Sequence, residues 1–284
     1  MAATIGLCSW IFGHRHHQRI AASAAALGCS GVELHVPIDR EPAAALRRLY
    51  ADHGLAILSL TPENVDLAHR DWRERRRALD YYERLIDYAA ELAAPAITLH
   101  ELVGRGSPHD SPAQEWERLR ESCAQVARQA EQRRLDLLLE PLRPPLVSRI
   151  QRSDAALALI EAVGSPRLRI VLDSFHMDAS EPDPEGAIQR CAGRLGAVQL
   201  ADRGRRGLGL GGIDLDGYWR AFAAIGFAGP WILECAVGLS GPSLQEQPVD
   251  QDQLWHELEA SISWLRARLD SPRLDADEQG SSSP

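Results

Sequence analysis

Four apolar runs in the second half of the chain each end on a side chain that can bind a metal ion. The residues at their ends are Glu140, Asp173, Gln199 and Glu234. Apolar runs such as residues 170–172 are typical of strands buried in a parallel sheet, whose carboxyl ends meet at one edge. Three carboxylates and one amide oxygen form a hard donor set that suits Mg²⁺ or Mn²⁺. The sequence therefore predicts one divalent cation at these four strand ends.

Each of the four residues also has a structural interpretation. A carboxylate at the end of a strand commonly caps the following helix or pairs with an arginine. Without a cation, however, three clustered carboxylates would repel and raise one another's pKa. A divalent cation removes that penalty, so the set taken together favours a metal site.

The elements that would position these residues alternate between short apolar runs and longer amphipathic segments, which is typical of repeated βα units. The pattern predicts strands over the ranges 4–8, 31–35, 55–60 and 96–99, and four more that carry the residues named above. It predicts helices over the ranges 18–27, 42–53, 71–92, 113–133, 153–163, 185–191, 218–225 and 254–269. Eight such units predict a single (β/α)₈ TIM barrel over residues 1–269, with its active site at the carboxyl ends of the strands. The polar stretch 270–284 predicts a disordered tail.

Composition excludes several classes of function. The 284 residues carry a formal net charge of −9, and all 31 basic residues are arginine. A chain without lysine cannot form the Schiff bases of lysine-dependent aldolases or pyridoxal phosphate enzymes. The acidic balance argues against nucleic acid as a partner. The cysteines are scattered and odd in number, which predicts buried free thiols and neither a disulfide framework nor a zinc ribbon.

No apolar run approaches the ~20 residues that span a bilayer, and residues 1–5 lack the features of a signal peptide. We therefore expect a cytoplasmic protein with no membrane partner that acts on a small-molecule substrate. The sequence leaves a homo-oligomer open.

Six motifs give the chain a family resemblance. They are Gly31–Leu34, Leu172–Met177, Val198–Asp202, Gly204-Arg205, Gly209–Asp214 and Leu233-Glu234. With them the chain resembles, from about Ile5 to Leu269, the xylose-isomerase-like TIM barrels that isomerise or epimerise sugars, and it looks most similar to the hydroxypyruvate isomerase branch. Many members have histidine where this chain has Gln199, whereas that branch has glutamine. The loop after Asp202 is slightly shorter than in that branch and lacks its proline before glycine, which leaves the substrate open.

The resemblance implies that one divalent metal ion, Mn²⁺ or Mg²⁺ with Zn²⁺ or Co²⁺ as alternatives, is ligated by Glu140, Asp173, Gln199 and Glu234. It implies that Glu140 and Glu234 act as an acid/base pair on opposite faces of a 2-keto or 2-hydroxy-aldehyde substrate, through a metal-stabilised enediolate. It also implies that His176 and Arg205 hold substrate oxygens. The alternatives are an orienting role for His176 and a surface position for Arg205.

Four further side chains near the expected strand ends are weaker candidates for substrate contacts. Glu33 and His35 lie two residues apart on one strand and share a face. Either could contact substrate, and a buried salt bridge is the alternative for Glu33. His100 follows the fourth strand and could line the pocket or belong to a loop. Trp10 follows the first strand and could form an apolar wall or pack in the core.

Two other features predict no site. His14, His16 and His17 have no acidic residue nearby, which indicates solvated histidines. The glycine-rich stretch 204–212 lacks the spacing of a phosphate-binding loop and predicts a flexible connection.

The leading interpretation is a metal-dependent isomerase or epimerase of a small sugar, keto acid or polyol ketone. A lyase that dehydrates a keto-polyol or a dehydroshikimate-like acid could use the same site, because fold and ligands do not separate the two. An abasic-site endonuclease shares the barrel but, by resemblance, needs an Asp-x-His where this chain has Asp202-Arg203-Gly204. A non-catalytic binding subunit is the fourth interpretation.

Overall fold

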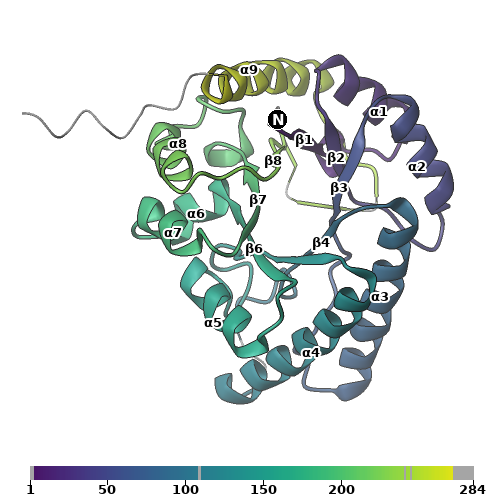
Figure 1. Cartoon of the computed structure of the whole chain (residues 1–284), viewed down its shortest axis with the longest axis vertical. Helices are drawn as coiled ribbons and strands as arrows, with labels where there is room; N and C mark the ends of the chain where they lie inside the picture. Colours follow the sequence, from purple (N-terminus) through teal and green to yellow (C-terminus); the bar gives the residue numbers. More distant parts are fainter. Residues whose placement is uncertain (1–2, 108–109, 240, 244, 271–284) are drawn as a thin grey trace, which may run out of the picture.

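Eight parallel strands form a closed barrel that helices surround (Figure 1). The computed structural model describes residues 3–107, 110–239, 241–243 and 245–270. The strands are β1 (Ile5–Cys8), β2 (Gly31–Leu34), β3 (Ala56–Leu60), β4 (Ala96–Leu99), β5 (Asp136–Leu139), β6 (Leu168–Asp173), β7 (Leu195–Leu200) and β8 (Trp231–Leu233). Strand β8 pairs with β1 in parallel and closes the barrel. The predicted TIM barrel is confirmed.

The helices of the described residues fill the connections between the strands. They are η1 (Ser9–Phe12), α1 (His17–Ala26), α2 (Ala43–Asp52), α3 (Trp72–Leu92), α4 (Pro112–Arg133), α5 (Ser153–Val163), α6 (Ser174–Ser180), α7 (Pro184–Cys191), η2 (Arg203–Arg205), α8 (Leu215–Ala224) and α9 (Gln251–Leu269). Helix α9 lies between α8 and α1 and completes the ring (Figure 1). The sequence did not predict α6, because seven residues are too few to show a helical period.

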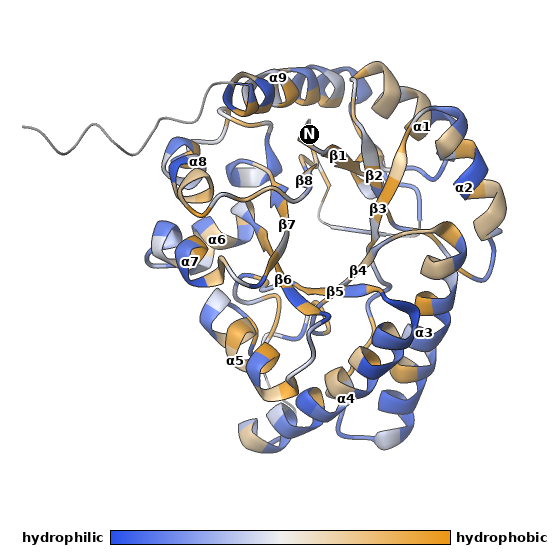
Figure 2. Cartoon of the chain, viewed as in Figure 1, coloured by the Kyte–Doolittle hydropathy of each residue, from blue (hydrophilic) through white to orange (hydrophobic). Residues whose placement is uncertain are grey.

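The long helices are amphipathic, as their sequences predicted. Helix α3 begins at its N-cap Asp71, whose side chain accepts from the backbone N–H of Arg73. Its buried face includes Tyr82, Leu85 and Ile86. Figure 2 shows blue, hydrophilic residues along much of α3 and α4. Burying one apolar stripe against the barrel is what makes such a helix stable.

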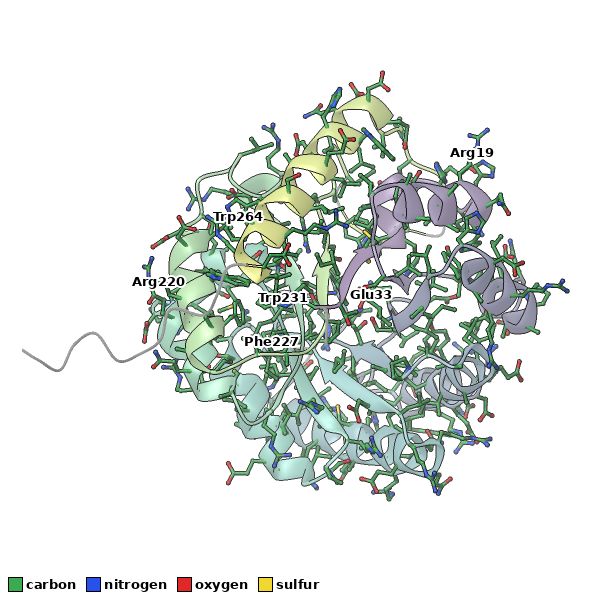
Figure 3. All side chains as sticks on the ribbon, turned by 45° about the horizontal axis from the view of Figure 1, so that its top comes forward. Arg19, Glu33, Arg220, Phe227, Trp231 and Trp264 are labelled. Carbon is green, nitrogen blue, oxygen red and sulfur yellow. The ribbon has the colours of Figure 1, made fainter. Side chains whose placement is uncertain are left out.

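Aromatic packing fixes β8, the strand that precedes Glu234. Trp231 at the start of β8 is almost fully buried. Its ring centroid lies 5.2 Å from that of Phe222 in α8 and 5.0 Å from that of Phe227, both edge-on. Figure 3 shows Phe227 beside Trp231 on this side of the barrel. Edge-to-face pairs of this kind add to the stability gained from area burial.

One extra residue in β7 changes its register against β6. The pairing skips Gly196, so that Asp173 at the end of β6 pairs with Gln199. Without this shift Asp173 would pair with Val198, and the side chain of Gln199 would lie on the other face of the sheet. The bulge therefore places two predicted metal ligands side by side.

Three expectations of the sequence concern regions outside the site. The five cysteines are free and buried, as predicted. The predicted tail 270–284 lies, apart from Asp270, outside the described residues. Within the part of the chain that the structure describes, no helix combines the length and apolar character needed to cross a membrane.

Candidate active site

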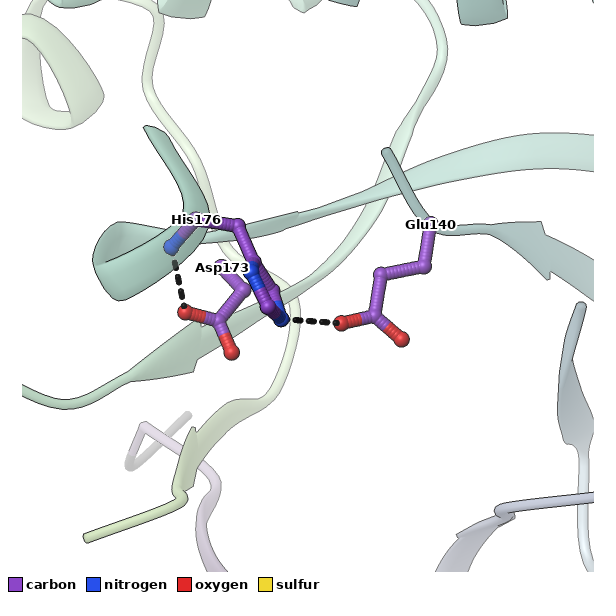
Figure 4. A group of neighbouring side chains, drawn as sticks. All are labelled: Glu140, Asp173 and His176. Atoms are coloured by element: carbon purple, nitrogen blue, oxygen red, sulfur yellow. Dashed lines mark hydrogen bonds and ion pairs between the residues drawn. The ribbon is translucent and has the colours of Figure 1, made fainter. Parts of the chain in front are cut away.

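Glu140, Asp173 and His176 lie together at the carboxyl ends of β5 and β6 (Figure 4). One potential ligand atom from each lies within 4.8 Å of the others, and all three side chains are buried. His176 Nε2 is 3.8 Å from Glu140 Oε1. The backbone N–H of His176 donates to Asp173 Oδ1 at 3.3 Å, because Asp173 also caps α6. A cluster of two carboxylates and an imidazole at this spacing can hold one metal ion.

The side-chain amide of Gln199 has one partner and one unmet oxygen. Its Nε2 donates to Glu33 Oε1 at 2.9 Å. Its Oε1 is buried and has no hydrogen-bond partner among the residues that the structure describes. A buried oxygen without a partner costs about 1–3 kcal/mol, and a cation beside Asp173 would satisfy it. Gln199 therefore fits the role of a ligand through its amide oxygen.

Arg205 joins the carboxylates of β6 and β8. Its Nη1 donates to Asp173 Oδ2 at 2.6 Å and to Glu234 Oε2 at 3.0 Å. Its Nη2 lies 3.1 Å from His176 Nε2, and because a guanidinium only donates, that ring nitrogen accepts. The other oxygen of Glu234, Oε1, accepts from Trp10 Nε1 at 2.7 Å. Strand ends far apart in the sequence thus meet at one guanidinium.

The acidic groups of this cluster have shifted pKa values. Burial raises the pKa of Glu140 well above its ordinary value, and the charge of Asp173 raises it further. Burial also raises the pKa of Glu234, although Arg205 opposes that shift. Burial favours the neutral form of Asp173 as well, but the charge of Arg205 and its hydrogen bonds outweigh it and lower the pKa of Asp173 to about 2. One arginine does not neutralise three carboxylates, and a divalent cation would supply the missing positive charge.

The histidine and the arginine of the cluster differ in charge. Burial lowers the pKa of His176 to about 3, so its ring is neutral at pH 7. Burial also disfavours charge on Arg205, but Asp173 and Glu234 outweigh this effect and raise the pKa of Arg205 above its ordinary value. The guanidinium carbon lies 4.5 Å from the ring centroid of Phe175, a cation–π contact. Arg205 is therefore not the surface arginine of the alternative interpretation.

The architecture and the sequence agree with one known family. The sequence model of the xylose isomerase-like TIM barrel family matches residues 21–267 of this chain. The chain belongs to this family. The resemblance read from the motifs is thereby confirmed at the level of the family, while the hydroxypyruvate isomerase branch stays a prediction.

Relatives within and around this family carry different activities. The L-ribulose 3-epimerase of Mesorhizobium japonicum is 28% identical over 176 residues, which cover 62% of this chain and 59% of that protein. The 3-dehydroshikimate dehydratase of Pseudomonas aeruginosa is 30% identical over 235 residues, which cover 75% of this chain and 35% of that protein. A solved structure of L-ribulose 3-epimerase shares the fold, with a TM-score of 0.83 at 23% identity over 95% of both chains. The match to these curated relatives spans less than two thirds of their length.

In this xylose isomerase-like barrel, Glu33 supports the site from below. Its carboxylate is fully buried and accepts from Ser59 Oγ, from Thr61 Oγ1 at 3.2 Å and from Cys8 Sγ at 3.3 Å, besides the amide of Gln199. No ion pair joins Glu33 to a basic group among the described residues, so the predicted alternative of a buried salt bridge is wrong. Hydroxyl, thiol and amide donors satisfy the Glu33 carboxylate instead. Because the Gln199 amide nitrogen faces Glu33, the Gln199 amide oxygen points away from it.

His100 takes a place next to Glu140 at the mouth of the barrel. The backbone N–H of Glu140 donates to the carbonyl of Leu99 at 2.8 Å. The ring of His100 is buried, and its Nδ1 lies 2.7 Å from the carbonyl oxygen of Glu101. Of the weaker candidates, Trp10 contacts the central cluster directly, whereas His100 lies beside it and Glu33 beneath it.

One expectation about histidines is corrected. His17 was predicted to be solvated together with His14 and His16, but His17 is buried and its Nδ1 lies 2.9 Å from the Tyr50 hydroxyl. Within α1, His17 shares its buried face with Ile20 and with later residues at helical spacing. That period was the signal that could have identified it.

Two residues of the site were missed by the sequence analysis. Phe175 packs under Arg205, and its only signal was an aromatic side chain two residues after Asp173. Asp202 organises the loop that carries Arg205: its Oδ1 accepts from Ile213 N and its Oδ2 from Gly209 N, both at 2.9 Å. The loop over residues 204–212 is thus folded onto a single buried carboxylate.

Proposed function

We propose that this protein is a divalent-metal-dependent epimerase or isomerase of a small ketose. One observation carries the proposal: the buried carboxylates of Glu140, Asp173 and Glu234 cluster around Arg205, beside the unpartnered amide oxygen of Gln199. The family relationship and the sugar 3-epimerase among the relatives support it.

The residues that would hold the metal are Glu140, Asp173, Gln199 and Glu234. His176 offers a nitrogen within the same cluster, which suits Zn²⁺ or Co²⁺ as well as Mn²⁺. When bound, a divalent cation polarises the substrate carbonyl and stabilises negative charge on its oxygens. Its positive charge would also let the three carboxylates ionise together.

The two glutamates are suited to move the proton. Burial raises the pKa of both carboxyl groups in the metal-free protein. A shared cation would oppose that shift, so that each could act as a carboxylate base or as a carboxylic acid. One glutamate removes the proton from the carbon next to the carbonyl, which leaves an enediolate. The other glutamate returns a proton on the opposite face to give an epimer, or on the neighbouring carbon to give an isomer. No oxidant or reductant is needed, because one proton leaves and one is added.

The other residues of the cluster position these groups. Trp10 and Arg205 hold one oxygen each of Glu234, which fixes the direction of its carboxylate. Arg205 lines the same space and would donate hydrogen bonds to oxygens of the enediolate as negative charge develops there. His176, whose Nε2 accepts from Arg205, would orient that guanidinium.

The test is substitution of the proposed base with proton exchange as readout. Purified Mn²⁺-loaded protein is incubated with L-ribulose in D₂O and followed by NMR. The wild type is expected to incorporate deuterium with the substrate mass otherwise retained, and Glu234→Gln is expected to lose at least about 10³-fold in rate. Unchanged exchange in Glu234→Gln would reject the mechanism.

A dehydratase is the second candidate, because the Pseudomonas relative is a 3-dehydroshikimate dehydratase. The same carbon acid is deprotonated, but the β-hydroxyl then leaves as water. The same NMR experiment with 3-dehydroshikimate separates the two: a new vinyl or aromatic proton signal indicates dehydration, whereas deuterium incorporation without loss of water indicates epimerisation.

A further inference from the structure

The backbone of Arg205 has a conformation that an arginine does not favour. Its φ is 60°, in the left-handed region where a Cβ is crowded, and Gly204 before it is left-handed as well. Among the described residues, the other non-glycine positions of this kind are Ala93 and Arg134, which end helices α3 and α4, where this conformation is common. Such a conformation in a loop persists only where the surroundings hold it. Contacts of the loop over residues 204–212 must therefore fix Arg205 in place.

Contacts at the barrel end fix one side of this loop. The side chain of Asp202 accepts from three backbone N–H groups of the segment 203–213. The carbonyl oxygen of Arg205 accepts at 2.8 Å from the N–H of Ala236, which lies two residues after Glu234. These contacts leave the backbone N–H groups of residues 207 and 208 to be bound from another direction.

Helix α9, in the outer ring of helices, binds them (Figure 1). Oε2 of Glu257 accepts from the backbone N–H of Gly207 at 2.6 Å, and Oε1 accepts from Nε of Arg206 at 2.7 Å. Ser261 lies one helical turn later on the same face, and its hydroxyl oxygen accepts from the N–H of Leu208 at 2.9 Å. Helix α9 thus binds all three residues that follow the arginine.

The carboxylate of Glu257 is buried and charged. Its residue is 4% exposed, and Oε1 also accepts from Nε2 of Gln253 at 2.9 Å. Burial raises the pKa of Glu257, but the hydrogen bonds from Gln253, Gly207 and Arg206 outweigh it and hold the pKa below its ordinary value. Both oxygens therefore act as acceptors at neutral pH, and an amide in this place would turn a donor toward a donor.

The loop and α9 also touch closely at Gly207. A Cβ on Gly207 would lie 2.8 Å from the carbonyl oxygen of Glu257 and 2.9 Å from its Cβ, which is closer than Cβ atoms come to other heavy atoms. Gly207 is not among the residues with positive φ, so the close approach, and not the backbone conformation, requires glycine here. A side chain at this position would push the loop away from the helix.

We infer that Glu257 is a positioning residue for Arg205: through the two residues after Arg205 it holds the left-handed turn that directs the guanidinium to Asp173 and Glu234. Its effect on catalysis rests on the proposed function. Glu257 belongs to the outer ring of helices, so a carboxylate without contact to the central cluster would set the rate of the reaction.

The first test changes either side of the contact. Glu257→Gln replaces an acceptor by a donor, and Gly207→Ala displaces the loop without removing a hydrogen-bonding side chain. With L-ribulose in D₂O at saturating Mn²⁺, each is expected to lower kcat for deuterium incorporation about 10- to 100-fold, with a smaller change in KM. The matched controls are Glu259→Gln at an exposed position of α9 and Gly193→Ala, where a Cβ would meet no atom within 4 Å. Their kinetics are expected to be unchanged.

The second test separates positioning from a general loss of stability. If Glu257 acts through Arg205, Glu257→Gln should cost less where Arg205 is already replaced. Urea midpoints in EDTA are measured for the wild type, Glu257→Gln, Arg205→Met and the double variant. We expect Glu257→Gln to shift the midpoint in the Arg205→Met background by at most about half of its shift in the wild type. Gly207→Ala in the same two backgrounds gives an independent cycle if the first double variant does not fold.

The outcomes are distinguishable. If kcat is the same in Glu257→Gln, Gly207→Ala and the wild type, the inference is wrong and the proposed function stands. Equal midpoint shifts in the two backgrounds would mean that Glu257 stabilises the fold independently of Arg205, which also overturns the inference. If the metal-loaded wild type exchanges no proton, the proposed function fails, and the cycle in EDTA still decides whether Glu257 positions Arg205.

Discussion

The indole nitrogen Nε1 of Trp10 lies 2.7 Å from Oε1 of Glu234, although 224 residues separate them in the chain. Trp10 belongs to η1 directly after β1, and Glu234 follows β8. The two strands pair to close the barrel, so closure itself brings the first and last strand ends together. With Arg205 on its other oxygen, Glu234 has a fixed orientation before substrate binds.

This contact predicts a kinetic effect of Trp10→Phe. The substitution keeps most of the aromatic area and removes the hydrogen bond. We expect kcat to fall about tenfold with a smaller change in KM, and the free energy of unfolding to fall by about 1 kcal/mol. Steady-state assays and urea denaturation measure the two effects. Trp72→Phe, at a side chain that is 63% exposed, is the matched control. An unchanged kcat in Trp10→Phe would show that orientation of Glu234 does not depend on Trp10.

Arg205 predicts a link between metal and stability. Arg205→Met leaves the buried carboxylates of Asp173 and Glu234 without their cationic partner, which costs about 3–5 kcal/mol in comparable buried pairs. We expect the free energy of unfolding of the metal-free protein, measured by urea denaturation, to fall by that amount. With Mn²⁺ present the fall should be smaller. Arg205→Lys keeps the positive charge but not the two-pronged guanidinium geometry. Its free energy of unfolding should lie between those of the wild type and Arg205→Met.

The exposed Arg220 gives the control for this experiment, since Arg220→Met removes a guanidinium from the surface of α8. If Mn²⁺ stabilised wild type and Arg205→Met to the same extent, the cation and the arginine would not share their carboxylates.

Much of this arrangement could be predicted from the sequence. Glu140, Asp173 and Glu234 could be identified because each stands where an apolar strand run stops, and the carboxyl ends of parallel strands meet. The βα alternation predicted a parallel sheet, and eight such units are the number that closes a TIM barrel. A helix cap was the alternative role for Asp173. The structure shows that Asp173 has both roles, because its Oδ1 caps α6 while its Oδ2 accepts from Arg205.

The rest depends on geometry that local patterns do not encode. The bulge at Gly196 decides that the side chain of Gln199 lies beside Asp173, and glycine alone does not reveal a register shift. The contact of Trp10 with Glu234 depends on barrel closure. The burial of Phe175 depends on where the loop brings Arg205.

The raised pKa values of Glu140 and Glu234 predict how stability depends on pH in the metal-free protein. Because their folded pKa lies above the unfolded value of about 4.3, the folded state binds protons more tightly. This contribution is fully present below about pH 4 and is lost as pH rises through the folded pKa. Asp173, with a pKa lowered to about 2, contributes above about pH 4 and loses that contribution as pH falls through about 2.

We therefore expect the free energy of unfolding with EDTA to fall as pH rises above about 5 until the folded pKa is passed, by at most about 1.4 kcal/mol per pH unit for each glutamate. Urea denaturation across this range measures it. Glu140→Gln should flatten the curve, and added Mn²⁺ should oppose the fall. Glu117→Gln, at an exposed position on α4, should leave the slope unchanged. Stability that rises over this range in EDTA would contradict the assignment.

Asp202 predicts a defect in positioning. Its two oxygens accept from three backbone N–H groups of the loop that carries Arg205, and Arg205 itself has a left-handed backbone with φ of 60°. Asp202→Asn replaces one acceptor by an amide that faces a donor, so the loop should shift. We expect kcat/KM to fall about 10- to 100-fold while Mn²⁺ content, measured by metal analysis, stays that of the wild type.

A loss of stability alone would not distinguish this role from ordinary capping. Asp183→Asn is the matched control, because Asp183 caps α7 through the backbone N–H of Gly186 and lies outside the carboxylate cluster. Both variants should lose about 1 kcal/mol of stability, but only Asp202→Asn should lose activity. Equal activity in the two variants would mean that Arg205 reaches Asp173 and Glu234 without help from Asp202, through its contacts with those carboxylates and with Phe175 alone.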